Sequence, residues 1–140
     1  TGYFTENIIV TPHMKEMSRL TGIQIEEMKE NPVRTAREFA DQYGVVCVLK
    51  DAATVIAGRD GKTFVNGSGT PAMAKGGSGD VLTGVIAGLV ALGLEESDAA
   101  ALGVYVHGLA GEAAEKHFGV HGVLAGEIAD CLSEVYRDGI

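Results

Sequence analysis

Basic residues and cysteines are scarce in this sequence of 140 residues, and each scarcity excludes a class of protein. Eleven Lys and Arg stand against 19 Asp and Glu, so the net charge is −8. This balance argues against nucleic acid or an anionic membrane as the main partner, because both require a basic surface. Cys47 and Cys131 are too few and too far apart for a disulfide framework or a zinc knuckle. We interpret them as core thiols of a reducing, cytoplasmic compartment.

Long apolar runs are also absent. The longest, from Val81 to Leu94, is interrupted by Thr and Gly and falls short of the roughly 20 residues that span a bilayer. It predicts a buried core helix instead. With 46% hydrophobic residues the chain can build a core, and its length fits one compact domain over residues 1–140. Because no initiator Met opens the sequence, we expect it to be a piece of a longer protein.

The first half of the chain predicts strands and helices in alternation. We expect a short strand over Asn7–Thr11, a helix over Met14–Leu20, a polar connection, and a second helix from Asn31-Pro32 to Gly44. A buried strand over Val45–Lys50 follows. Two further apolar runs, at residues 54–57 and 63–65, flank Asp60-Gly61, which predicts a hairpin. From residue 80 onward we expect only helices, at about 80–92, 98–117 and 126–137.

Glycine is abundant, with 20 residues, or about twice ordinary usage. Three of these glycines lie in Gly76-Gly77-Ser78-Gly79, directly before a predicted helix. Glycines let backbone N–H groups approach a ligand closely, and a helix N-terminus adds free donors and a positive dipole end. The segment therefore predicts an anion site for phosphate. It is neither a P-loop nor a Rossmann fingerprint, because the spacing of both motifs is absent.

Asp80 follows this segment and has two interpretations. It could be the N-cap of the helix, a position that Asp favours. A carboxylate beside a phosphate site is electrostatically unfavourable, however, unless it serves as a base. In that case Asp80 would take a proton from a hydroxyl that attacks the phosphate, while the N–H groups of the loop stabilise the transferred charge.

Four motifs together resemble the ADP/ATP-dependent NAD(P)H-hydrate dehydratases of the ribokinase-like superfamily. The first is M-A-x-G-G-S-G-D-V-L-T-G-x-I-A-G-L at residues 73–89. Residues 11–16 are similar to T-P-H-P-G-E, residues 48–56 to V-L-K-G-x-x-T-V-I, and residues 103–111 to G-V-Y-x-H-G-L-A-G. Gly-Gly-Ser-Gly-Asp alone would support only a ribokinase-like kinase, whereas the four motifs in this order are specific. Met14, Lys15, Asp51 and Thr70 depart from the family pattern.

The resemblance implies a fold and an activity. The fold would be the C-terminal portion of a ribokinase-like three-layer α/β/α sandwich, with a mostly parallel sheet and a β-hairpin. The family transfers phosphate from ADP or ATP to the hydroxyl of hydrated NADH or NADPH (NADHX or NADPHX), and then eliminates it to regenerate the cofactor. Mg²⁺ would accompany the nucleotide, held mainly through its phosphates and not by a metal site of the protein.

Site residues follow from the motif positions. Asp80 would be the base and would contact the hydrate together with His13. The adenine nucleotide would meet Gly79 and the segment Lys50, Asp51, Ala52, Ala53 and Thr54. Gly76, Gly77, Ser78 and Gly79 would form the anion hole. For His107, inside an apolar helix, we favour a hydrogen-bonded core histidine over a ligand.

Two alternatives remain open at this point. A ribokinase-like kinase for a small vitamin-like alcohol would share the glycines and Asp80, but should lack the motifs at 11–16 and 103–111. Family members have about twice this length, so the chain could also be a nucleotide-binding or structural fragment without activity. A half-sheet exposes a strand edge, which favours pairing with another copy, so we expect a homo-oligomer.

Overall fold

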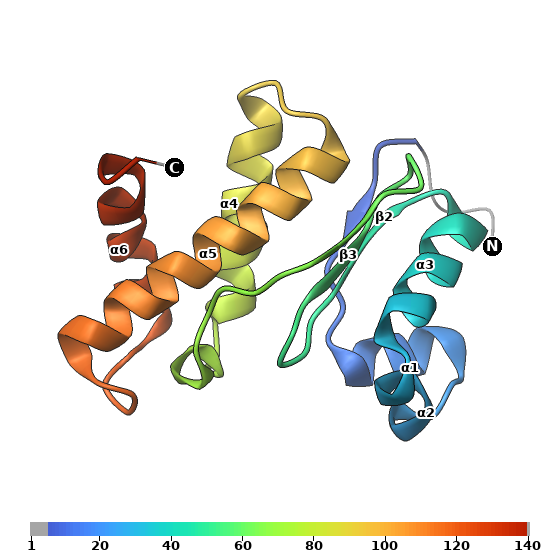
Figure 1. Ribbon diagram of the computed structural model, residues 1–140, viewed down its shortest axis with the longest axis horizontal. Coiled ribbons are helices and arrows are strands. Elements are labelled where there is room, and N and C mark those ends of the chain that lie inside the picture. Colours follow the sequence, from blue (N-terminus) through green and yellow to red (C-terminus); the bar gives the residue numbers. More distant parts are fainter. Residues whose placement is uncertain (1–5, 140) are drawn as a thin grey trace. The chain divides into compact units, whose positions relative to one another are not determined.

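The computed structural model describes residues 6–139, which form two compact units (Figure 1). One unit comprises the chain up to Asn66 together with Glu95–Ala101, and the other comprises Gly67–Leu94 together with the chain from Leu102. The first, which we call the sheet unit, holds all the described strands and the helices before residue 44. The second, which we call the helical unit, holds most of the helical residues after residue 67. None of the described helices combines the length and apolarity needed to cross a membrane.

The sheet unit contains a four-stranded sheet in the order β1-β2-β3-β4. These strands are β1 (Ile9–Val10), β2 (Val46–Leu49), β3 (Val55–Ala57) and β4 (Thr63–Val65). β1 pairs with β2 in parallel, whereas β2–β3 and β3–β4 are antiparallel. The sheet of the described residues is therefore less parallel than the sequence predicted, because the hairpin supplies two of its three pairings. The predicted hairpin itself is confirmed.

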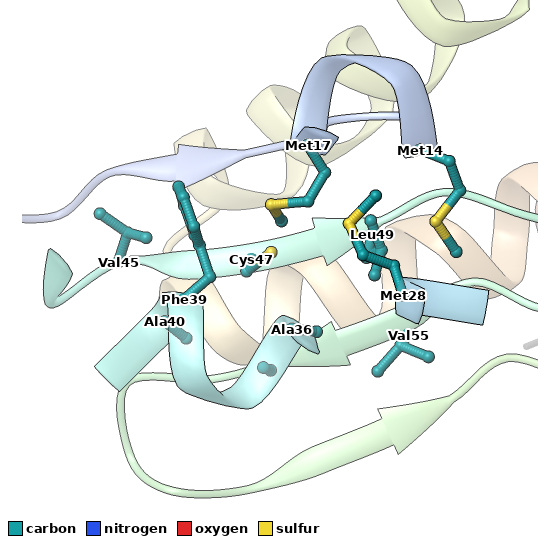
Figure 2. Close-up of a cluster of buried hydrophobic side chains, with 11 residues drawn as sticks. Met14, Met17, Met28, Ala36, Phe39, Ala40, Val45, Cys47, Leu49 and Val55 are labelled. Atoms are coloured by element: carbon teal, nitrogen blue, oxygen red, sulfur yellow. The ribbon is translucent and has the colours of Figure 1, made fainter. Parts of the chain in front are cut away.

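Three helices cover one face of this sheet: α1 (Met14–Thr21), α2 (Ile25–Glu30) and α3 (Pro32–Tyr43). Their apolar side chains pack against alternate residues of β2 and β3 (Figure 2), and the cluster comprises Met14, Met17, Met28, Ala36, Phe39, Ala40, Val45, Cys47, Leu49, Val55 and Ala57. The opposite face carries Val46, Val48 and Ile56, which are also fully buried. Burial on both faces explains the uninterrupted apolar run of β2.

The boundaries of α3 follow the predicted signals. The Asn31 side chain accepts a hydrogen bond from the Arg34 N–H at 3.0 Å, and Gly44 ends the helix with a φ of +64°. The polar connection predicted before α3 is wrong, because the structure contains α2 there. Fully buried Met28 anchors this helix to the core. Ile25, one turn before Met28, packs against the same core but is only partly buried. Two apolar residues in a helix of six are too short a pattern to predict it from the sequence.

The helical unit begins with a 3₁₀ turn, η1 (Pro71–Met73), and continues through α4 (Ser78–Ala91), α5 (Glu96–Phe118) and α6 (Ala125–Arg137). The sequence predicted a buried core helix after residue 80, but only one face of α4 is buried. Leu82, Val85, Ile86 and Leu89 form its buried face, whereas Thr83, Gly84, Ala87 and Gly88 are exposed. Small residues made the exposed face look apolar in the sequence although it has little side-chain surface to bury.

Candidate active site

In the sheet unit, the carboxyl ends of β1 and β2 bring two motifs together. The Lys50 N–H donates a hydrogen bond of 2.9 Å to the Pro12 carbonyl oxygen, and His13 and Lys50 form a parallel bridge. The motifs at residues 11–16 and 48–56 are therefore neighbours in space, although Glu16 and Lys50 are 34 positions apart in the sequence. Ligands of open α/β sheets bind outside the carboxyl ends of the strands. This edge is thus the candidate ligand-binding edge of the sheet unit.

His13 and Glu16 form a capping box at the start of α1. The Glu16 N–H donates to His13 Nδ1 at 3.2 Å, and the His13 N–H donates to Glu16 Oε2 at 2.8 Å. This backbone hydrogen bond, reinforced by the charges of Lys50 and Arg19, lowers the pKa of Glu16 below its ordinary value. The His13 side chain remains about half exposed, with Nε2 3.5 Å from Glu16 Oε1. The motif therefore has a structural role, and leaves Nε2 accessible.

A wide hollow of about 480 Å³ opens beside this capping box. It is lined by Val10, Thr11, Pro12, Glu16, Arg19 and Leu20. Glu16 and Arg19 provide one charge of each sign on an otherwise largely apolar wall. Arg19 is not among the predicted site residues, and its position one helical turn after Glu16 is the signal that could have identified it.

The predicted nucleotide segment lies at the same edge. Lys50 is half-buried, Asp51, Ala52 and Ala53 form an exposed turn, and Thr54 is again half-buried. The Thr54 carbonyl oxygen accepts the Asn66 N–H at 2.9 Å, so the turn leads directly into the hairpin. Within residues 6–139, the Asp51 carboxylate forms no ion pair. The turn therefore presents one unneutralised negative charge to solvent.

In the helical unit, the glycine loop (Gly76–Gly79) leads into α4. Gly77 is the N-cap, with a left-handed φ of +88° that explains the requirement for glycine there. The N–H groups of Gly76, Gly77 and Gly79 donate to no acceptor in the described part of the chain. Three free donors beside the positive end of the α4 dipole are groups that can bind an anion, and the phosphate site at this loop stays a prediction.

Asp80 lies in the first turn of α4, three residues after the N-cap. The interpretation of Asp80 as the N-cap is therefore wrong, because the helix begins inside the glycine loop, two residues earlier than the pattern indicated. Its side chain is exposed and forms no hydrogen bond or ion pair within residues 6–139. A free carboxylate next to free N–H donors fits the other interpretation, in which Asp80 serves as a base.

One face of α5 packs against the segment that precedes α4. We call it the support face and define it as His107, Gly108, Gly111 and Glu112. His107 Nε2 lies 3.4 Å from Ser78 Oγ, and both side chains are buried. The Gly69 N–H donates to Glu112 Oε1 at 2.8 Å. His107 is thus a buried, hydrogen-bonded histidine, as predicted.

The two glycines of the support face allow close approach. A Cβ at Gly108 would meet Ser68, including its backbone carbonyl carbon at 2.8 Å, and a Cβ at Gly111 would meet the Met73 side chain. Ser68 Oγ also donates to the Tyr105 carbonyl oxygen at 2.9 Å. The sequence analysis missed Gly108, Gly111 and Glu112 as parts of the site. Their spacing of three and four residues was the available signal.

The structure therefore arranges the predicted site residues in two groups. His13 and the segment Lys50–Thr54 share one edge of the sheet unit, and Gly76–Asp80 share the N-terminus of α4 in the helical unit. Among residues 6–139 no three His, Cys, Asp or Glu side chains are arranged to hold a metal ion. Cys47 and Cys131 are free and buried, as predicted, and burial raises the pKa of Cys47 to about 12.

Comparison with known proteins explains why these motifs occur together. A family model described as NAD(P)H-hydrate dehydratase matches residues 1–134. The chain belongs to this family. Among curated members, a bifunctional NAD(P)H-hydrate repair enzyme of Moorella thermoacetica is 44% identical over 131 residues, which cover 94% of this chain and 25% of the relative. An ADP-dependent (S)-NAD(P)H-hydrate dehydratase of Bacillus subtilis is 38% identical over 93% of this chain and 47% of the relative.

Similar solved structures agree with this family and with the predicted fold. The ADP/ATP-dependent NAD(P)H-hydrate dehydratase from Bacillus subtilis, co-crystallized with ATP/Mg²⁺, superposes with a TM-score of 0.89 at 38% identity, covering 93% of this chain and 47% of that chain. A ribokinase-like superfamily protein of Enterococcus faecalis superposes with a TM-score of 0.82 at 32% identity, covering 96% and 46%. The predicted family and ribokinase-like fold are confirmed.

The comparisons also show what share of its relatives' length this chain covers. This chain spans about half the length of the Bacillus subtilis dehydratase and a quarter of the Moorella thermoacetica repair enzyme. The names of these relatives favour the hydrate interpretation over a kinase for a vitamin-like alcohol.

Proposed function

We propose that this chain carries the phosphate-transfer end of an NAD(P)H-hydrate dehydratase, with NADHX or NADPHX as substrate and ADP or ATP as co-substrate. The observation that carries the proposal is the N-terminus of α4. There, among the described residues, the exposed Asp80 carboxylate has no ion-pair or hydrogen-bond partner and follows three backbone N–H groups of the glycine loop that donate to no acceptor. Membership of the dehydratase family supports the choice of hydrate over other alcohols.

The chemistry assigned to Asp80 is proton abstraction. The carboxylate takes the proton of the hydrate hydroxyl as that oxygen bonds to the terminal phosphorus of the nucleotide, and the bond from this phosphorus to the remaining nucleotide breaks. Phosphate then leaves the ring carbon with the bonding electrons, the neighbouring ring carbon loses a proton to solvent, and the ring double bond of the reduced nicotinamide forms. The N–H groups of Gly76, Gly77 and Gly79 stabilise the charge on the transferred group, the kind of electrostatic stabilisation that dominates phosphoryl transfer.

The sheet unit would bind the remainder of the ligands. We place His13 against the hydrate and the segment Lys50–Thr54 against the adenine nucleotide, which agrees with their shared position at the carboxyl edge. The described residues contain no carboxylate cluster for a metal. They fit Mg²⁺ only as an ion held through the phosphates of the nucleotide, where it would neutralise charge during transfer.

Three further properties belong to the same proposal. We propose that the two units work as one domain, because the motifs of a single family are divided between them. We also propose a homo-oligomer, since the outer edges of β1 and β4 pair with no other described strand. A cytoplasmic location agrees with two free, buried thiols.

The test is recovery of absorbance at 340 nm when the chain meets NADHX with Mg²⁺ and ADP or ATP. Asp80→Asn should abolish recovery, because the amide cannot accept the proton. Asp98→Asn is the matched control: Asp98 is also exposed in the first turn of a helix, α5, and its loss should leave the rate unchanged.

The reaction is measured twice, with the chain alone and with the chain joined to the remaining portion that its relatives carry. Activity in either form that Asp80→Asn removes and Asp98→Asn retains would support the proposal. If neither form turns over hydrate although calorimetry shows ADP binding, the chain is a nucleotide-binding fragment and the enzymatic proposal fails.

A further inference from the structure

The side chain of Ser78 is buried although it lies within the exposed glycine loop. Gly76 and Gly77 are exposed and Gly79 is half-exposed, whereas Ser78 retains only 7% of its accessible surface. Its Oγ points toward His107 Nε2 at 3.4 Å, and His107 is itself 8% exposed. A buried hydroxyl next to a buried imidazole is a polar contact that excludes water at the start of α4.

The other contacts of the support face hold residues 68 and 69, which precede the glycine loop in the sequence. Glu112 accepts the Gly69 N–H at 2.8 Å, and Gly108 allows the backbone of Ser68 to approach α5 closely. His107 is the member of this face that reaches the glycine loop itself. Within the loop, the Ser78 N–H donates to the Lys75 carbonyl oxygen at 3.2 Å, and the N–H groups of Asp80 and Val81 both donate to the Gly77 carbonyl oxygen, at 3.1 and 3.2 Å. None of these hydrogen bonds uses the N–H groups of Gly76, Gly77 or Gly79.

We propose that His107 is a positioning residue that orders the glycine loop through Ser78. By fixing the first residue of α4, it holds the N–H groups of Gly76, Gly77 and Gly79 in one arrangement next to Asp80 in the first turn of α4. His107 does not touch the ligand. The role assigned to the bound phosphate rests on the proposed function, whereas the ordering of the loop does not.

Because the contact is made through Nε2, two substitutions of His107 can separate a role in hydrogen bonding from a role in packing alone. In His107→Gln the side-chain amide reaches about as far as Nε2 and can exchange a hydrogen bond with Ser78 Oγ. In His107→Asn the amide ends one methylene short and cannot reach. Ser78→Ala removes the other partner with little change of volume. A role in packing alone would make Gln and Asn similar, whereas the proposed role separates them.

The measurement is ¹⁵N relaxation of the backbone amides of Gly76, Gly77 and Gly79 in the free chain. We expect order parameters of about 0.85 in the wild type and in His107→Gln. In His107→Asn and Ser78→Ala we expect them to fall to about 0.6. The double variant His107→Asn/Ser78→Ala should be no more mobile than either single variant, because both remove the same contact. Unchanged amide shifts in α6 report that the helical unit remains folded.

The inference is overturned if Ser78→Ala leaves these order parameters unchanged, or if His107→Gln behaves like His107→Asn. Titration with ADP and Mg²⁺ forms a second arm, in which loss of the contact should weaken binding about fivefold. A wild-type chain that binds no ADP would count against the proposed function alone. The order parameters of the free chain would still decide whether His107 positions the loop.

Discussion

The close approach of Ser68 to α5 predicts that Gly108→Ala destabilises the chain. Alanine is normally preferred to glycine inside a helix by about 1 kcal/mol, so the substitution tests whether packing outweighs propensity. The new Cβ would lie 2.7 Å from Ser68 Cβ and 2.8 Å from its carbonyl carbon. Rotating the hydroxyl relieves neither contact, because the carbonyl carbon belongs to the backbone.

The expected loss of stability can be estimated from how far the Ser68 backbone must move. An ordinary contact is at least 3.4 Å, so the Ser68 backbone has to shift by about 0.6 Å. Overpacking of this kind costs about 1–3 kcal/mol. Loss of the hydrogen bond from Ser68 Oγ to the Tyr105 carbonyl oxygen adds about 1 kcal/mol. After the gain in helix propensity, we expect a net destabilisation of about 1–3 kcal/mol.

Alanine substitutions at two other helical glycines give reference values for the stability change. A Cβ at Gly84 in α4 meets nothing within 4 Å, so Gly84→Ala should stabilise the chain by about 1 kcal/mol. A Cβ at Gly111 meets only the flexible Met73 side chain, so Gly111→Ala should fall between the two. Urea unfolding measures all three, with a midpoint about 1 M lower for Gly108→Ala. If Gly108→Ala is as stable as wild type while Gly84→Ala shows its gain, the packing argument is refuted.

Three other predictions concern charge and ionisation. Asp51→Asn removes a negative charge near the proposed nucleotide, so calorimetry should show ADP binding about 2–5-fold tighter, and unchanged affinity would contradict this placement. The lowered pKa of Glu16 means that its stabilisation is present above about pH 4.5 and is lost as pH falls through the folded pKa. The urea midpoint of wild type should therefore fall more steeply below pH 4.5 than that of Glu16→Gln, whereas parallel curves would refute the argument. Burial raises the pKa of Cys47 to about 12 and also raises that of Cys131, which is less deeply enclosed, so mass spectrometry should find iodoacetamide on Cys131 first.

Local signals in the sequence predicted most of the sheet unit. Asn31-Pro32 and Gly44 marked the ends of α3, and Asp60-Gly61 marked the turn between β3 and β4. These residues act through their own backbone preferences, so their effect does not depend on distant partners. The short helix α2 was missed because its stability comes from burying Met28 in a core assembled by α1, α3 and β2. Tertiary packing of that kind leaves no local pattern.

The chemistry of the glycine loop stays a prediction, whereas the expected start of the helix after it is wrong. Three glycines before a helix predict an anion site, and within residues 6–139 the N–H groups of Gly76, Gly77 and Gly79 donate to no acceptor. Asp80 has the side chain of a good N-cap, which moved the expected start of α4 to that residue. Gly77 takes the position instead, because its left-handed φ of +88° turns the chain into the helix earlier.

The motif at residues 103–111 illustrates what sequence reasoning alone could not resolve. Its residues were recognised as a family signature, but nothing in their order shows which distant segment they meet. In the structure, Gly108 and Gly111 are small because Ser68 and Met73 occupy the space of a side chain, and His107 reaches Ser78. These contacts join α5 to the segment that leads into the glycine loop. If the positioning role proposed for His107 holds, substitutions on the support face should change binding without removing any group that touches substrate.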